Sequence, residues 1–182
     1  MNVYDFDKTI YNGDASLDFW KFSIKKQPTL IRYLPYQIFS AVLFKIRILN
    51  RKQFKEHFFI FLKSIHSLDL TRFWDQNQDK IKTWYFNQKK PDDLIISASP
   101  EFILKEITKR LQVKLISTKM NQRTGKIIGE NCRGEEKVKR FRELYKDQQI
   151  DQFYSDSESD TPLKKLAVIA YLVKKNQITD WK

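Results

Sequence analysis

Short apolar runs that end in polar residues recur along the chain, once at its start and several times in its second half. The runs lie near Val3, Leu94, Leu115, Phe153 and Tyr171, and segments with a helical spacing of apolar residues separate them. Alternating strands and helices are typical of parallel sheets, because each crossover connection places a helix on a face of the sheet. We therefore predict an α/β fold, a three-layer α/β/α sandwich with a parallel central sheet.

Local patterns add detail to this sandwich. The spacing from Glu135 to Tyr145 predicts a helix, and residues 123–126 read as a hairpin turn before Ile127 and Ile128. The last apolar run, 170–173, is followed by residues 176–179, which predict a short return strand at the edge of the sheet.

A long, mostly helical segment interrupts the α/β pattern. Its helices break near Pro28, bend near Pro35, and begin again around Asn50 and around residues 67–69. An uncharged window, 33–44, is far shorter than the roughly 20 residues that cross a bilayer. It predicts a helix that is either buried or lies at a membrane surface.

This helical segment divides the chain into two predicted units. We expect residues 1–12 and 91–182 to form the α/β core, and residues 13–90 to form an inserted α-helical bundle with residues 89–93 as its return hinge.

Candidate chemistry begins at the first predicted strand, where Asp5, Asp7 and Thr9 alternate with other residues. Alternate side chains of a strand point the same way, so the two carboxylates can converge. Two close aspartates repel each other unless a cation lies between them or one keeps its proton, and oxygen ligands suit Mg²⁺. This arrangement suits transfer of a phosphoryl group through an aspartyl-phosphate.

Two further elements could bind a phosphate. The apolar run that starts at Asp93 ends in Ser97, whose hydroxyl and the following helix start would face an anion; Ser99 reads as the N-cap of that helix. Lys137 lies in the first turn of the predicted helix 135–145, where the macrodipole is positive, so an anion should compensate it. Pairing with a neighbouring glutamate is the alternative.

The fourth element is a loop rich in acids and serines after the run near Phe153. Asp156 and Asp160 lie four residues apart across a turn and can both point at one cation. The alternative is an acidic turn with a helix cap at Asp160 or Thr161.

Together these four elements resemble the four motifs of the haloacid dehalogenase superfamily, over essentially the whole chain. The resemblance is closest to the phosphoserine-phosphatase-like branch, which carries a helical cap between its first and second motifs. It implies a Rossmann-like core, a Mg²⁺ cofactor, and residues 13–90 as the cap over the active site.

The resemblance also implies a role for each motif residue. Asp5 would be the nucleophile and a metal ligand, and Asp7 the general acid and base, with its backbone carbonyl on the metal. Lys137 would neutralise charge on the phosphate. The other implied roles are metal ligation by Asp156, orientation of Lys137 or a metal-bound water by Asp160, support of the motif loop by Thr9, and phosphate or substrate binding by Thr9, Ser97, Ala98 and Asp14.

The resemblance does not extend to the substrate. Lys8 replaces a glycine common in relatives, and Ser97-Ala98-Ser99-Pro100 replaces the Ser-Gly-Gly turn of phosphoserine phosphatases. Asp14 stands near the position of their substrate-binding glutamate.

Charge is distributed unevenly along the chain. The 182 residues carry 34 Lys and Arg against 22 Asp and Glu, a net charge of +12, and most of the excess lies between Trp20 and Ser64 among large apolar residues. Three interpretations stay open for this basic, aromatic surface: a solvated bundle, docking to a membrane that presents a phosphorylated lipid, or nucleic-acid binding. No recognisable nucleic-acid-binding module supports the last.

One cysteine, Cys132, is compatible with a reducing compartment, and the start of the sequence shows no secretory signal pattern. We expect a cytoplasmic protein, with a peripheral place at the inner membrane surface as the alternative.

The sequence leads to three functional hypotheses. The first is a Mg²⁺-dependent phosphomonoester phosphatase that acts on a phosphorylated small molecule, a lipid phosphate being one candidate. The second is a phosphotransferase or mutase of the same fold. The third is a non-catalytic module that binds membranes or acidic partners through the basic cap.

Overall fold

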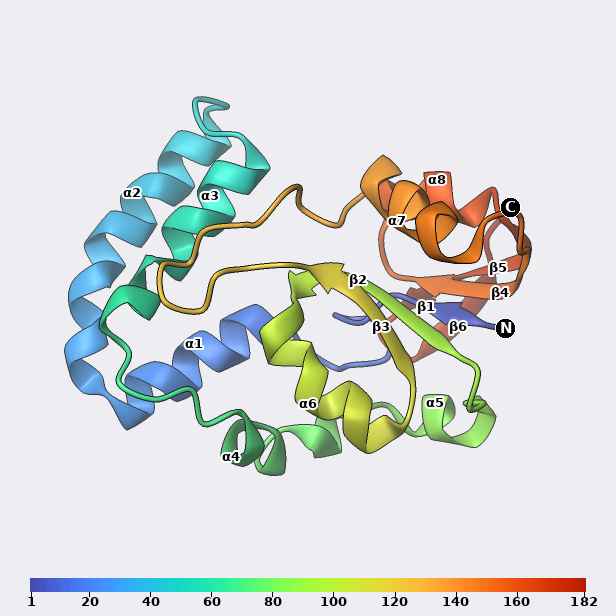
Figure 1. Ribbon diagram of the computed structural model, residues 1–182, viewed down its shortest axis with the longest axis horizontal. Helices are drawn as coiled ribbons and strands as arrows, with labels where there is room; N and C mark the ends of the chain where they lie inside the picture. Colours follow the sequence, from blue (N-terminus) through green and yellow to red (C-terminus); the bar gives the residue numbers. More distant parts are fainter.

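A computed structural model describes residues 1–182 as a six-stranded sheet with helices on both faces and a helical region that follows the first strand (Figure 1). The strands are β1 (Val3–Tyr4), β2 (Leu94–Pro100), β3 (Lys114–Thr118), β4 (Ile150–Ser155), β5 (Ala167–Lys174) and β6 (Gln177–Asp180). Their order in the sheet is β3-β2-β1-β4-β5-β6, and all neighbours are parallel except β5 and β6. The predicted α/β sandwich with a parallel sheet is confirmed.

The central strands are apolar on both faces because helices cover both. Val3 and Phe153 pack on one side of the sheet, with Phe141 of α7 (Glu135–Tyr145). Tyr4 and Tyr154 pack on the other, where their rings stack 4.9 Å apart. Successive residues of a strand therefore enter different cores, which explains why these strands read as continuous apolar runs.

The helices and their 3₁₀ extensions fill the connections between the strands. Those of the inserted region are α1 (Ala15–Lys26), η1 (Pro28–Tyr33), α2 (Leu34–Lys45), α3 (Arg51–Phe58), η2 (Phe59–Ser64), α4 (Leu70–Asp75), η3 (Gln78–Lys80) and α5 (Thr83–Gln88). Those of the remaining chain are α6 (Glu101–Leu111), α7 (Glu135–Tyr145), η4 (Glu158–Asp160) and α8 (Thr161–Lys164). None of these helices is long and apolar enough to span a bilayer.

Most of the predicted boundaries are confirmed. A 3₁₀ helix begins at Pro28, Asn50 caps α3 through a capping box with Gln53, and Asp69 caps α4. The helix 135–145 and the return strand are also present. The expected hairpin after residues 123–126 is limited to a single antiparallel bridge between Met120 and Ile127.

The inserted region has two parts that pack differently. α2 and α3 run side by side and project from the rest of the molecule (upper left in Figure 1). α4 instead packs against α6, where Trp74 donates a hydrogen bond from its indole nitrogen to the carbonyl of Ile103 at 2.7 Å and meets the ring of Phe6 edge-on. The division into a core of 1–12 and 91–182 and a cap of 13–90 stays a prediction.

Replacing Trp74 tests the attachment of α4 to the core. The side chain is fully buried, so we expect Trp74→Ala to lower the free energy of unfolding by about 3–5 kcal/mol, measured by urea titration. Phe86→Ala, at an exposed aromatic residue of α5, is the matched control and should cost less than about 1 kcal/mol. Equal losses from the two variants would contradict this packing.

Candidate active site

A cavity of about 510 Å³ lies where β1, β2 and β4 end, beneath α3. Parallel strands direct their carboxyl ends to one edge of the sheet, and ligands bind there in open α/β folds. Every predicted site residue except Thr9 lines this cavity: Asp5, Asp7, Asp14, Ser97, Ala98, Lys137, Asp156 and Asp160.

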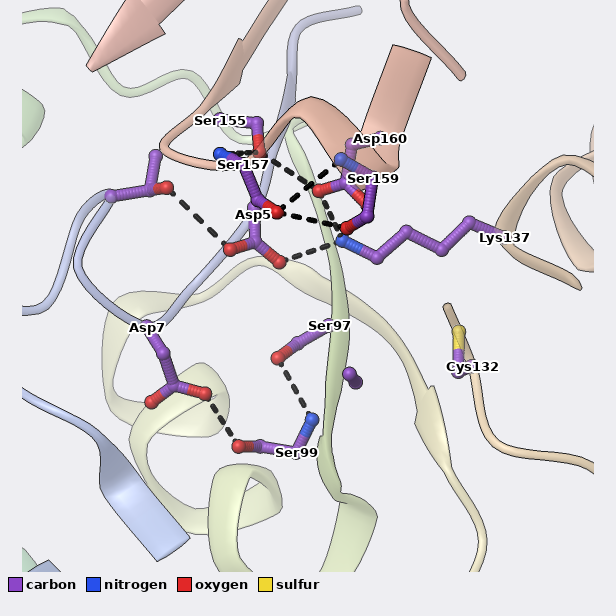
Figure 2. A network of polar contacts seen from close by, with 12 residues as sticks. Asp5, Asp7, Ser97, Ser99, Cys132, Lys137, Ser155, Ser157, Ser159 and Asp160 are labelled. Atoms are coloured by element: carbon purple, nitrogen blue, oxygen red, sulfur yellow. Dashed lines mark hydrogen bonds and ion pairs between the residues drawn. The ribbon is translucent and has the colours of Figure 1, made fainter. Parts of the chain in front are cut away.

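Lys137 holds two carboxylates together at the base of the cavity. Its ammonium nitrogen donates to Oδ1 of Asp5 and to Oδ2 of Asp160, at 2.7 Å each (Figure 2). The side chain is only 2% exposed. Burial would lower the pKa of this lysine, but Asp5 and Asp160 outweigh burial and raise it. Lys137 is therefore a fixed positive charge, not a solvated lysine paired with a neighbouring glutamate.

The start of α7 aims Lys137 into the site. Gly134, just before the helix, has a φ of 57° with a ψ of −128°, a conformation that residues with a Cβ rarely adopt. Ser155, at the end of β4, donates its hydroxyl to Oδ2 of Asp160 at 2.8 Å and so fixes the second carboxylate.

Thr9 does not line the cavity but links the loops that follow β1 and β4. Its hydroxyl accepts from the amide of Asp156 at 2.9 Å and lies 3.5 Å from Oδ2 of Asp5. Because that second contact is long, Oδ2 of Asp5 keeps free lone pairs. Burial raises the pKa of Asp5 to about 6, against the opposing effect of Lys137.

The hydrogen-bond partners of Asp7 are neutral groups, whereas Asp5 is paired with the cation Lys137. Its Oδ1 accepts from the amide of Ala15 at 2.6 Å, and its Oδ2 accepts from the hydroxyl of Ser99 (Figure 2). Burial and the nearby Asp14 raise the pKa of Asp7 to about 7, despite these two hydrogen bonds. A carboxyl group with this pKa can give and take a proton near neutral pH.

The interpretation of Ser99 as a helix cap is wrong. Pro100 occupies the N-cap position of α6 without a side-chain cap, and the Ser99 hydroxyl points to Asp7 instead. The amide of Ser99 donates to the hydroxyl oxygen of Ser97 at 3.1 Å, which leaves the hydroxyl proton of Ser97 free for a ligand in the cavity.

Asp14 has a structural task in addition to its place at the cavity. One carboxylate oxygen accepts from the amide of Leu17 at 3.0 Å and caps α1. Asp14 therefore contributes negative charge near Asp7 while its geometry is set by the helix start.

The donor set suits Mg²⁺. Asp5 and Asp156 offer hard carboxylate oxygens, and the carboxylate of Asp156 accepts no hydrogen bond and joins no ion pair. Burial raises the pKa of Asp156 and the nearby Asp160 adds to this effect, whereas Lys8 and Lys137 oppose it. No three acidic, histidine or cysteine side chains cluster closely enough to enclose a cation. Backbone oxygen and water would complete the shell, as is usual for Mg²⁺.

Three cations on the opposite wall of the cavity were not predicted. Lys55 of α3 donates to the carbonyl of Ala98 at 2.6 Å and to the side-chain oxygen of Asn131 at 2.8 Å, and burial lowers its pKa to about 8. Arg51, one turn earlier on α3, and Arg133 also line the cavity, and neither forms an ion pair. Burial and Arg133 lower the pKa of Arg51. The available signal was the i, i+4 spacing of Arg51 and Lys55 within the basic segment.

Comparisons with known proteins agree with this fold. A family model described as haloacid dehalogenase-like hydrolase matches residues 3–165. A protein of unknown function from Bordetella pertussis Tohama I has a similar structure, with a TM-score of 0.70 and 18% identity over 91% of this chain and 85% of that one. A search of curated proteins gave no match.

Two further similar structures belong to proteins with phosphoserine in their names. A phosphoserine phosphohydrolase-like protein from Francisella tularensis subsp. tularensis SCHU S4 gives a TM-score of 0.57 at 12% identity, over 93% of this chain and 86% of that one. A phosphoserine phosphatase solved as a phospho-aspartyl intermediate analogue gives 0.56 at 14% identity, over 92% and 83%. At such identities the likeness extends to the fold alone.

Removing the lysine tests the buried charge cluster. In Lys137→Met, Asp5 and Asp160 lose their cation, so we expect the free energy of unfolding at neutral pH without metal to fall by about 3–5 kcal/mol. Burial already raises the pKa of Asp5 above its unfolded value, and without the opposing Lys137 this effect grows, so the loss should shrink as pH is lowered and the native state takes up protons. Urea titrations at several pH values measure both effects.

Lys80→Met is the matched control, because Lys80 forms a partly exposed ion pair with Asp18 and should cost at most about 1 kcal/mol. A pH-independent loss in Lys137→Met, or a loss no larger than that of the control, would contradict the assignment.

Proposed function

The chain belongs to the haloacid dehalogenase-like hydrolase family, and we propose that it is a phosphatase that hydrolyses phosphate monoesters through an aspartyl-phosphate on Asp5. The observation that carries the proposal is the contrast between two carboxylates in one cavity. Asp5 is held at one oxygen by Lys137, and Asp7 has a pKa near neutrality among neutral donors.

In the first step, Oδ2 of Asp5 attacks the phosphorus of the ester. The bond from phosphorus to the ester oxygen breaks, and protonated Asp7 gives its proton to that oxygen, which leaves as an alcohol. Oδ1 of Asp5 stays against Lys137 at 2.7 Å, so the free oxygen is the one available for attack.

In the second step, water attacks the phosphorus of the aspartyl-phosphate. Asp7, now a carboxylate, takes a proton from that water, the bond between phosphorus and Asp5 breaks, and inorganic phosphate leaves. Asp5 is regenerated as a carboxylate and Asp7 as the acid, which closes the cycle.

Positive charge and hydrogen-bond donors stabilise the transferring group, whose negative charge spreads over its equatorial oxygens. Lys137 is within reach of an oxygen next to Asp5, and the Ser97 hydroxyl has a free proton. Mg²⁺ held by Asp5, Asp156 and the carbonyl of Asp7 would supply several further kcal/mol of charge stabilisation.

The cations of the opposite wall favour a substrate with a second anionic group. Lys55, Arg51 and Arg133 have no carboxylate partner in the cavity, and like charges at close range repel each other until an anion separates them. We propose that they bind a carboxylate or second phosphate of a phosphorylated small molecule.

The other two hypotheses are less well supported. A non-catalytic module would not need a complete set of buried catalytic groups, whose desolvation is costly. Transfer to a second alcohol instead of water is tested by adding glycerol to the assay and looking for glycerol phosphate.

The single buried thiol, Cys132, fits a reducing compartment such as the cytoplasm.

Substitution of the nucleophile tests the reaction. We expect Asp5→Asn to lower turnover of an aryl phosphate by at least about 10⁴-fold, because no covalent intermediate can form. Ser97→Ala removes one donor and should cost about 10²-fold. A colorimetric assay with Mg²⁺ and with a chelator measures both, and undiminished turnover in Asp5→Asn or full activity under chelation would defeat the proposal.

The pH dependence of substrate binding tests Lys55. Because its pKa is lowered to about 8, the ammonium charge is lost as pH rises through that value, and kcat/KM for a phosphomonoester with a second anionic group should fall. Lys55→Met should raise KM by about 10- to 100-fold and remove this alkaline decline. Steady-state kinetics across pH measure the effect.

Lys52→Met, on the same helix but bonded to the carbonyl of Gly129 at the surface, is the control and should keep the wild-type profile. An unchanged alkaline decline in Lys55→Met would exclude Lys55 as its source.

A further inference from the structure

The helix α2 is amphipathic with its apolar side turned outward. Ile38, Phe39 and Val42 are 57%, 59% and 51% exposed, whereas Gln37 and Ser40 on the opposite side are 5% and 0% exposed. A surface helix of a globular protein normally shows the reverse arrangement. Large contiguous apolar surfaces of this kind mark sites of interaction with a partner or a membrane.

The polar side chains on the inward side of α2 form hydrogen bonds with the rest of the protein, and these bonds fix the orientation of the helix. The side chain of Gln37 accepts from the indole nitrogen of Trp20 at 3.1 Å and donates to the carbonyl of Phe58 at 2.7 Å. The hydroxyl of Ser40 lies 3.0 Å from Nδ1 of His57. Rotating α2 to bury its apolar side would leave these groups without partners.

The apolar side continues beyond the helix and has a cationic border. Tyr36 precedes the central residues, and Ile46 and Ile48 follow them in the exposed turn before α3. Arg32 lies at one end, and Lys45 and Arg47 lie at the other. No acidic residue occurs between residues 19 and 55.

We propose that the outward side of α2, defined by Tyr36, Ile38, Phe39, Val42, Ile46 and Ile48, docks on the surface of an anionic lipid bilayer. Apolar side chains enter the boundary between headgroups and acyl chains, and the bordering cations face anionic headgroups. A second copy of the chain fits less well, because docking two such faces would bring two cationic borders together. The helix has 12 residues and lies on the bilayer without crossing it.

This surface is structurally connected to the cavity. Phe44, at the end of α2, stacks on Phe54 of α3 with ring centroids 4.8 Å apart, and the guanidinium of Arg51 lies 5.3 Å from the Phe44 ring centroid. Phe54 and Arg51 both line the cavity. If the proposed phosphatase function holds, docking would bring the cavity close to phosphorylated headgroups.

Vesicle sedimentation of the full chain tests the docking independently of catalysis. We expect binding to vesicles of equal parts phosphatidylcholine and phosphatidylglycerol, no binding to phosphatidylcholine alone, and weaker binding as salt is raised. The triple variant Ile38→Ser, Phe39→Ser, Val42→Ser should lower the partition coefficient by at least about tenfold. Lys45→Gln with Arg47→Gln should lower it by about fivefold per charge removed.

Matched controls distinguish binding through this surface from nonspecific adsorption to the vesicles. Val168→Ser with Ile169→Ser alters another exposed apolar pair, and Lys105→Gln with Lys109→Gln removes two exposed lysines of α6; both should bind like the wild type. Aryl phosphatase activity and thermal unfolding of each variant confirm folding. Failure of the wild type to bind anionic vesicles at low salt overturns the proposal, as does a salt-stable dimer in analytical ultracentrifugation that the triple variant abolishes.

Discussion

The ion pairs of Lys137 with Asp5 and Asp160 are the constraint on which the site depends. They join residues that are 132 and 23 positions apart in the chain, and they fix α7 against the ends of β1 and β4. A buried charge is costly unless it is paired and hydrogen-bonded, so few alternative arrangements of these three side chains are tolerable. The same contacts orient Asp5, because one carboxylate oxygen is occupied and the other is directed to the cavity.

Environment gives the two aspartates of the first motif different properties. Asp5 lies beside a fixed cation, whereas Asp7 accepts hydrogen bonds from Ala15 and Ser99 and faces the charge of Asp14. Burial raises the pKa of both, to about 6 and about 7. Two chemically identical side chains, two residues apart, can thereby serve as nucleophile and proton carrier.

The parts of the fold that could be predicted from the sequence are those governed by local pattern. β1, β2 and β4 are buried on both faces and therefore read as apolar runs, and the caps at Asn50 and Asp69 follow rules of short range. The cap predicted at Ser99 is wrong because capping rules consider only neighbouring residues. The Ser99 hydroxyl instead donates to Asp7, which is 92 residues away in the chain. Lys55 was missed because helical spacing does not reveal that the loop at Asn131 encloses it. The orientation of α2 was equally hidden, since periodicity defines two sides of a helix but not which one faces the protein.

We propose that the phosphoryl group passes through Asp5, and acid-quenched mass spectrometry can detect this covalent intermediate. The protein is mixed with Mg²⁺ and an aryl phosphate, quenched within one turnover, reduced with borohydride and digested. We expect Asp5 to be recovered as homoserine, the reduction product of an acyl phosphate, in the peptide that contains it, and to be unmodified in a sample without substrate. Efficient turnover with Asp5 unmodified, or with the label on another side chain, would contradict it.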